Sequence, residues 1–152
     1  MFRKLIISAG VFLSFFSYSA MAATEVFEVR AILRAAIAII EVDFLNFGTI
    51  EIPTGSPTLF AIAASGGAQL NGGNAAEFSV TGEAVQTATV SVTPSVTATV
   101  GLTTLTFNLT LSTTSITFPT ANIFVGGNVT IPVGADSGNY SDTTATLTLL
   151  YN

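Results

Sequence analysis

Cysteine, histidine and tryptophan are all absent from the 152-residue chain. Without cysteine there are no disulfide bonds, so the fold must be held by buried apolar surface or by a partner. Without histidine or cysteine there is no imidazole base, no thiolate nucleophile and no usual zinc or copper ligand. Glu41 and Asp43 would share one face of a strand, whereas glycosidases take their two carboxylates from different elements across a cleft. We therefore predict no enzymatic activity and no cofactor.

Positive charge is also scarce. The four basic residues are Arg3, Lys4, Arg30 and Arg34, against nine Asp and Glu residues. The first two lie in an N-terminal segment that we expect to be removed, which leaves two basic and nine acidic residues and a net charge close to minus seven. A mature chain of that charge is a poor partner for nucleic acid or for an anionic membrane.

The N-terminal segment "MFRKLIISAGVFLSFFSYSAMA" has the pattern of a secretory signal. Two basic residues precede an apolar run, and Ala20 and Ala22 have the A-x-A spacing of a signal peptidase site. The run is shorter than the roughly 20 apolar residues that a spanning helix needs. We predict a signal peptide over residues 1–22, cleavage before Ala23, and export of the mature chain.

The residue types that are abundant favour strands. Hydrophobic residues make up 49% of the chain and charged residues 9%, which suits a single domain with a real core. The apolar residues are mixed with many Thr residues, and β-branched side chains favour β-structure. Eight short stretches read as strands, at residues 45–52, 58–64, 77–81, 87–93, 96–107, 108–117, 128–133 and 142–151.

Turn residues separate these stretches. The segments "PTGSP", "SGGAQLNGGN", "VGGN" and "GADSGN" supply the Gly, Pro and Asn that turns require, so the glycine pairs, Gly126 and Gly127 included, read as loop glycines. None of them has the strand and helix context of a phosphate-binding loop. The pattern predicts an all-β, immunoglobulin-like β-sandwich, with a barrel as the weaker alternative.

The start of the mature chain, "ATEVFEVRAILRAAIAII" at residues 23–40, has an alternating pattern. One side carries the apolar residues Phe27, Val29, Ala31, Leu33, Ile37 and Ile39, and the other carries Glu28, Arg30 and Arg34. Ordinary strands have about 5 to 6 residues, so this alternation predicts an abnormally long strand. A helix over "AILRAAIAII" is the alternative, because its residues are mostly good helix formers.

One loop has the oxygen ligands of a weak calcium candidate. In "GADSGNYSD", Asp136, Asn139 and Asp142 recur every three residues between glycines. Asp and Asn also cap turns through their own backbone, and the spacing is not that of an EF-hand. We favour the turn and predict no metal site.

Three stretches carry a resemblance to a known family. They are "FLNFGTI" at residues 44–50, "AEFSVTG" at 76–82, and the C-terminal block "FVGGNVTIPVGADSGNYSDTTATLTLLYN". Their order resembles the bacterial secreted family known as a domain of unknown function, DUF4402, whose members are similar to fimbrial subunits. The ending also resembles that of chaperone-usher pilins, which have a glycine fourteenth from the end and a penultimate Tyr. Here Tyr151 is penultimate and Gly138 is fifteenth from the end.

This resemblance implies a function. Such pilins are immunoglobulin-like sandwiches that lack one strand, and the N-terminal extension of the next subunit fills the gap. It implies a donor extension over residues 23–30, a pilin domain over residues 31–152, donor residues Phe27, Val29, Ala31 and Leu33, and an acceptor groove beside Leu147, Leu149 and Tyr151. The implied partners are other copies of the chain, a periplasmic chaperone and an outer-membrane usher, and the implied location is a fimbria on the cell surface.

Two other functions fit an exported β-sandwich. One is a monomeric adhesin or surface-coat domain whose N-terminal strand folds back onto its own sheet. The other is a glycan-binding module, but such modules present Trp or Tyr platforms, and only Tyr140 and Tyr151 remain after residue 22. The missing lysine of the mature chain favours the fimbrial subunit, because monomeric β-proteins protect their open sheet edges with lysine or proline.

Overall fold

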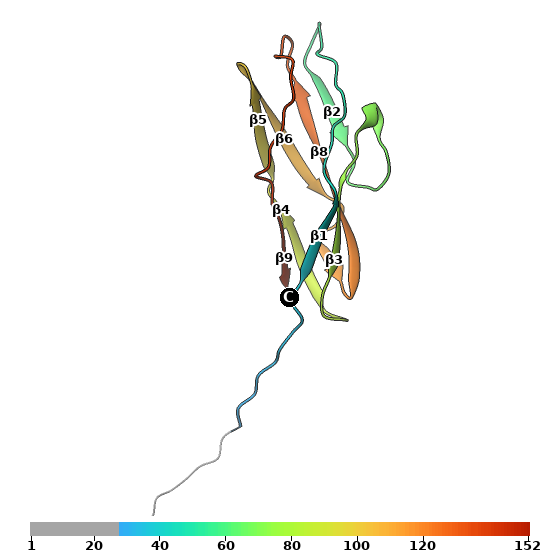
Figure 1. Ribbon diagram of the computed structural model, residues 1–152, viewed down its shortest axis with the longest axis vertical. Helices are drawn as coiled ribbons and strands as arrows, with labels where there is room; N and C mark the ends of the chain where they lie inside the picture. Colours follow the sequence, from blue (N-terminus) through green and yellow to red (C-terminus); the bar gives the residue numbers. More distant parts are fainter. Residues whose placement is uncertain (1–27) are drawn as a thin grey trace, which may run out of the picture. The chain divides into compact units, whose positions relative to one another are not determined.

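The computed structural model describes residues 28–152 and divides the chain into two units, residues 1–32 and 33–152 (Figure 1). The predicted signal peptide and Phe27 lie outside the described residues. In the first unit, residues 28–32 have no helix or strand, and Arg30 donates a hydrogen bond of 2.6 Å to the carboxylate of Glu28.

The second unit is built from β-strands, which confirms the predicted all-β sandwich. Its described residues form two antiparallel sheets. The strands are β1 (Ala38–Asp43), β2 (Thr58–Ile62), β3 (Ala76–Thr81), β4 (Thr87–Val92), β5 (Ser95–Val100), β6 (Thr103–Leu111), β7 (Ser115–Thr117), β8 (Thr120–Ile131) and β9 (Leu147–Tyr151), with a 3₁₀ turn, η1, at Leu70–Gly72.

Strand β8 is the centre of the larger sheet, whose order is β1-β3-β8-β6-β5. One edge of β8 pairs with β3 up to Val125 and then with β2 from Gly127 onward. The other edge pairs with β6 from Val125 to Val129. Strands β3 and β2 therefore follow one another along the same edge, and β1 lies outside β3.

The smaller sheet, β7-β4-β9, covers one half of the larger one. Between them lies a cluster of buried side chains that we call the closed core: Val80, Ala88, Val90, Ile116, Phe118 and Ile123. These residues alternate along their strands, so that Ala88 and Val90 of β4 face Val80 and Ile123 of the other sheet. A second cluster, which we call the groove floor, lies under the other half of the larger sheet and consists of Leu105, Val129, Ile131 and Ala135.

The predicted long strand over residues 23–40 is wrong in the described part of the chain. Strand assignment begins only at Ala38 and continues to Asp43, and residues 28–37 are neither strand nor helix. Alternation shows which side chains share a face, but a strand also needs a partner for its backbone. The helix considered for residues 31–40 is absent as well.

Several predicted boundaries are also wrong. The strand predicted at 96–107 is the hairpin of β5 and β6, which turns at Gly101 with a φ of 59°. The strand predicted at 45–52 is irregular, and the one at 108–117 is broken between β6 and β7. Gly126 and Gly127 are not in a loop but inside β8. A Cβ at Gly126 would overlap the carbonyl oxygen of Ile62 in β2, and one at Gly127 would lie 2.5 Å from that of Asn108 in β6. Both are glycine because β2 and β6 approach β8 closely.

Candidate functional site

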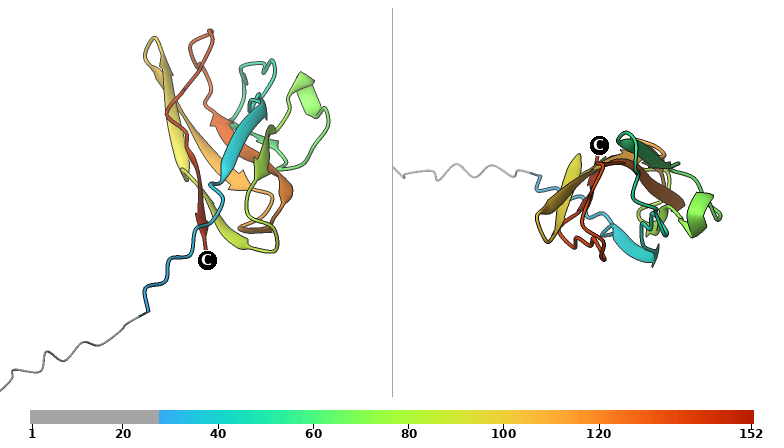
Figure 2. Two further views of the ribbon diagram at one scale, coloured as in Figure 1. Left: turned by 60° about the horizontal axis from the view of Figure 1, so that its bottom comes forward. Right: turned by 90° about the horizontal axis from the view of Figure 1, so that it is seen from above.

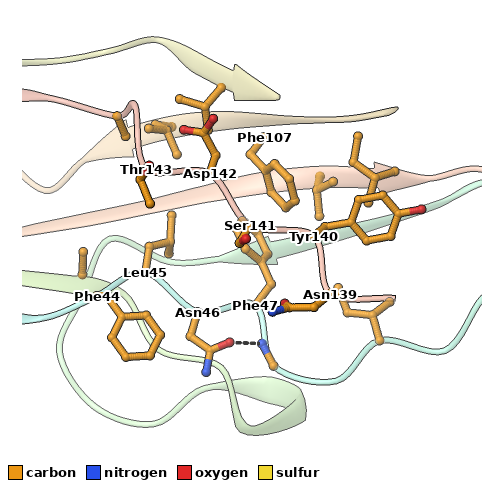
Figure 3. Close-up of a pocket in the computed structure, with 18 of the residues that line it drawn as sticks. Phe44, Leu45, Asn46, Phe47, Phe107, Asn139, Tyr140, Ser141, Asp142 and Thr143 are labelled. Carbon is orange, nitrogen blue, oxygen red and sulfur yellow. Dashed lines mark hydrogen bonds between the residues drawn. The ribbon is translucent and has the colours of Figure 1, made fainter. Parts of the chain in front are cut away.

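An apolar groove of about 840 Å³ opens over the groove floor. Its base is the inner face of β6 and β8, which contributes Leu105, Phe107, Leu109, Val125, Val129 and Ile131. Two irregular segments, residues 44–52 and 135–146, form its walls, and Figure 3 draws parts of both around the ring of Phe107. The groove therefore lies where the smaller sheet does not cover the larger one.

The first wall is fixed by the "LNFG" motif. Asn46 exchanges two backbone hydrogen bonds with Asn74, each 2.8 to 2.9 Å long, and its side chain accepts one from the N–H of Gly48 (2.8 Å; Figure 3). Gly48 has a φ of 71°, and a Cβ there would overlap the carbonyl oxygen of Asn71. This tight turn sends Phe47 into the groove, where its ring lies 5.3 Å from that of Phe107.

The second wall is attached to the β5–β6 hairpin by Asp136. One oxygen of this carboxylate accepts hydrogen bonds from the N–H groups of Leu102 (2.7 Å) and Thr103 (3.1 Å) and from the Thr103 hydroxyl (3.1 Å). Tyr140, which packs against the groove floor, donates its hydroxyl to the carbonyl of Asp136 at 2.8 Å. Hydrogen bonds of Asp136 therefore fix the beginning of this wall segment, residues 135–146, whose backbone lies outside any sheet.

The weak calcium candidate consists of residues with other roles. Asp136 caps the hairpin, and one oxygen of Asp142 accepts the N–H and the hydroxyl of Thr144, at 2.7 and 2.8 Å. The N–H of Leu102 and the hydroxyl of Thr103 lower the pKa of Asp136, and the N–H and hydroxyl of Thr144 lower the pKa of Asp142. Asn139 lies on the same groove wall. Within residues 28–152 no group of three or more His, Cys, Asp or Glu side chains is placed to hold a metal ion.

Glu41 and Asp43 do not share a strand face. Their partners in β3 are the consecutive residues Phe78 and Glu77, because a bulge lies between them. Glu41 lines the apolar groove, whereas Asp43 lines a separate pocket of about 330 Å³ beside the glycine-rich loop. The i, i+2 spacing in the sequence predicted a shared face, because the extra residue of a β-bulge cannot be recognised from an alternating pattern.

The structure places only one of the predicted acceptor residues at the groove. All three pack against the closed core, where the Tyr151 ring meets that of Phe118 at 5.3 Å, and Leu147 alone of the three also lines the groove. Among the described strands, β9 pairs only with β4 and β1 pairs only with β3. The gap between β1 and β9 is therefore bridged by no backbone ladder in the part of the chain that the structure describes.

The residues just before β1 contact the end of β9. We call this set of contacts the clamp; it is made by Arg34, Ala35, Glu83 and Tyr151. The Tyr151 hydroxyl donates to the carbonyl of Ala35 at 2.9 Å and accepts from the N–H of Glu83 at 2.6 Å. The N–H of Ala35 donates to the Glu83 carboxylate at 3.1 Å. Figures 1 and 2 show the start of β1 beside the C-terminus, where these contacts lie.

Arg34 adds to the clamp from the other side. Its guanidinium donates a hydrogen bond of 3.4 Å to the carbonyl of Asn152 and lies 5.8 Å from the centre of the Tyr151 ring. Asn152 is itself held by β4, because its N–H donates to the carbonyl of Thr87 and its side chain bonds two Thr hydroxyls. Arg34 is therefore bound within its own chain.

The predicted donor residues lie before this clamp. Val29 and Ala31 belong to the described part of the first unit, in backbone with no strand assigned. Leu33 begins the second unit with 91% of its surface exposed. Phe47, Phe107 and Tyr140 were not predicted as groove residues, and Glu83 was not predicted as a clamp residue. The alternation of β6 gave a signal for Phe107, but no local pattern marks Glu83.

Comparison with known proteins identifies a family. Residues 37–151 match the model of the family described as "Domain of unknown function (DUF4402)", and the chain belongs to that family. No curated protein and no solved structure matches the chain. Among residues 28–152, no helix has the length and apolar character needed to cross a membrane.

Proposed function

We propose that this protein is a structural subunit of a bacterial surface fimbria and that it polymerises head to tail by donor-strand exchange. In this proposal the segment of residues 23–33, which we call the arm, inserts into the apolar groove of a second copy. The observation that carries the proposal is the groove itself, an open channel with an apolar base between two wall segments whose backbone is largely outside any sheet.

The groove has what β-strand addition requires. A strand added to a sheet gains backbone hydrogen bonds at the edge and places alternate side chains in pockets. Here β1 has one described partner, β3, which leaves its other edge open. The groove base is lined by aliphatic and aromatic side chains, which suit the apolar face of the arm: Phe27, Val29, Ala31 and Leu33.

Charge does not select the arm as the occupant of the groove. Residues 35–152 contain no Lys or Arg, and removing Glu25 and Glu28 from the nine acidic residues leaves seven carboxylates in this part. Three of the seven, Glu41, Asp136 and Asp142, line the groove. The arm carries Glu25 and Glu28 as well as Arg30, and Arg30 is bonded to Glu28, so the arm brings no net positive charge and its apolar face carries the proposal.

The energy of insertion is large enough to matter. Burial of an apolar side chain contributes about 1.5 to 3 kcal/mol, so four arm residues contribute on the order of 6 to 12 kcal/mol as an upper bound. This is comparable to the whole net stability of a domain, about 5 to 15 kcal/mol. Insertion would therefore stabilise a subunit that has no disulfide.

The proposal includes a route to the surface. The signal peptide directs export, a periplasmic chaperone covers the groove before assembly, and an outer-membrane usher exchanges the chaperone for the arm of the next subunit. Since each arm enters a different copy, the contact does not close on itself and a filament results. The fibre lies outside the cell and serves adhesion.

The test is to export the mature protein and to examine it by size-exclusion chromatography and electron microscopy, beside a variant that lacks residues 23–30. We expect fibres from the complete protein and short or single subunits from the variant, because the variant keeps its groove but lacks most of the donor.

A matched control replaces Val29 and Ala31 with Ser, which keeps the arm length but lowers its apolar surface; polymerisation should weaken. A mature protein that remains a monomer at all concentrations would contradict the proposal and favour the monomeric adhesin. Loss of stability on deletion of residues 23–30, without any loss of polymer, would show that the arm completes its own subunit.

A further inference from the structure

The clamp lies at the point where the arm joins its own subunit. Ala35 has both backbone groups engaged there, its N–H by Glu83 and its carbonyl by Tyr151. No turn or bend is assigned at residues 33–37, so the backbone passes through the clamp without reversing direction. The root of the arm is therefore held in a conformation other than a hairpin.

A hairpin at this position is the shortest way for a chain to fill its own groove. A three-residue loop at residues 34–36 would place Leu33 opposite Ile37 and Ala31 opposite Ile39. Ile37 packs against the closed core, and Ile39 pairs with the fully buried Val80 of β3. That register would direct the apolar face of the arm inward, so side-chain chemistry alone does not prevent completion within one chain.

The sequence at the loop position opposes this hairpin. Residues 30–40 contain no Gly, Pro, Asn, Asp or Ser, the residues that tight turns use. A three-residue hairpin loop needs its last residue in the left-handed region, where Ala36 is disfavoured. Formation of the hairpin would also break the bonds of Ala35 to Tyr151 and Glu83.

We propose that the clamp determines the specificity of strand completion: it prevents the arm from entering its own groove and so leaves the arm for a second copy. This inference rests on the proposed function, because it assumes that the arm is the occupant of the groove. The specificity-determining residues are Glu83 and Tyr151, together with the absence of turn residues at Ala35 and Ala36.

The experiment compares the mature protein with Tyr151→Phe, Glu83→Ala, Ala35→Asn/Ala36→Gly, and the combination of Tyr151→Phe with the two loop substitutions. Tyr151→Phe removes both hydrogen bonds of the hydroxyl and keeps the ring that contacts Phe118. The loop substitutions supply turn chemistry, with Gly at the left-handed position. Thr104→Val is the control, because it removes a surface hydroxyl bond to Thr99, distant in sequence from the clamp.

The readouts are the fraction of monomer after size exclusion and the hydrogen-exchange protection of residues 25–33 in that monomer. We expect the combined variant to raise the protected monomer about tenfold or more, since two lost hydrogen bonds and a favourable turn shift the balance by at least that factor. Each single change should act in the same direction with a smaller effect, and Thr104→Val should match the unaltered protein.

The outcomes separate the two proposals. Clamp and loop variants that fold and polymerise like the unaltered protein, with no protected monomer, would overturn the clamp inference and leave the fimbrial function standing. An unaltered protein that is already a protected monomer would overturn both. If Tyr151→Phe fails to fold, Glu83→Ala and the loop variant, which keep the tyrosine, decide the question.

Discussion

The two halves of the sandwich differ in how completely they are filled. In the closed core, between the two sheets, Val80 and Ile123 have no exposed surface and Tyr151 seals the end. Over the groove floor, Val129 is equally buried, but the rings above it, Phe47, Phe107 and Tyr140, are only partly covered. The larger sheet therefore contributes to a fully packed core at one end and carries an open apolar surface at the other.

The difference follows from the length of the smaller sheet. Strand β8 runs for 12 residues, whereas β9 has 5 and β7 has 3, so the smaller sheet covers only part of its partner. The segment that precedes β9, residues 135–146, belongs to no strand and forms one irregular wall of the groove. An exposed apolar surface of this kind typically marks a binding site, and in our proposal the arm of a second copy binds there.

The sharpest way to test the contrast is to truncate one side chain in each half. Ile123→Ala in the closed core should lower the free energy of unfolding by about 2 to 5 kcal/mol, because it leaves a cavity that cannot collapse. Phe107→Ala in the groove should cost about 1 to 1.5 kcal/mol in the monomeric protein, because its ring is only partly buried. Urea unfolding measures both, and equal losses would contradict the distinction.

A substitution at Gly126 tests how closely β2 approaches β8, the strand that runs through both halves. Gly126→Ala should destabilise the subunit by about 1 to 3 kcal/mol, because its Cβ would overlap backbone atoms of Ile62. Gly55→Ala is the matched control, since nothing lies within 4 Å of its Cβ position, and it should change stability by less than about 0.5 kcal/mol. Thermal unfolding of both variants measures the difference, and a neutral Gly126→Ala would argue against the close approach of β2 and β8.

Low pH should lower the stability of the half that contains the groove more than that of the closed core. We expect this effect to be smaller than those of the two sets of substitutions above. The folded pKa of Asp136 lies below the usual 3.8, so its hydrogen bonds contribute fully above that value and are lost as the pH falls through the folded pKa. Asp136→Asn should therefore make stability less dependent on pH below about 3.8. Glu51→Gln is the comparison, because the Glu51 carboxylate accepts no hydrogen bond from residues 28–152. An unchanged acid slope in Asp136→Asn would contradict the cap.

The sequence predicted the fold class because alternation and turn chemistry are local. The strands over 58–64, 77–81 and 87–93 were close to β2, β3 and β4 for that reason. The groove could be predicted only through resemblance, because it depends on which strands lack a neighbour. The prediction that Gly126 and Gly127 lie in a loop was wrong, because a glycine required by closely spaced strands cannot be distinguished in the sequence from a glycine required by a turn. The clamp joins Ala35, Glu83 and Tyr151, which are far apart in sequence, and no local sequence pattern predicts contacts between such distant residues.

The most direct test of the groove as an acceptor uses the absence of cysteine. Subunits carrying Val29→Cys in the arm are mixed with subunits carrying Leu109→Cys in the groove base, under oxidising conditions, and covalent dimers are counted on a non-reducing gel. Thr106→Cys, on the exposed face of the same strand β6, replaces Leu109→Cys as the control. We expect abundant disulfide-linked dimers with Leu109→Cys and few with Thr106→Cys. Equal yields, or none with either, would contradict it.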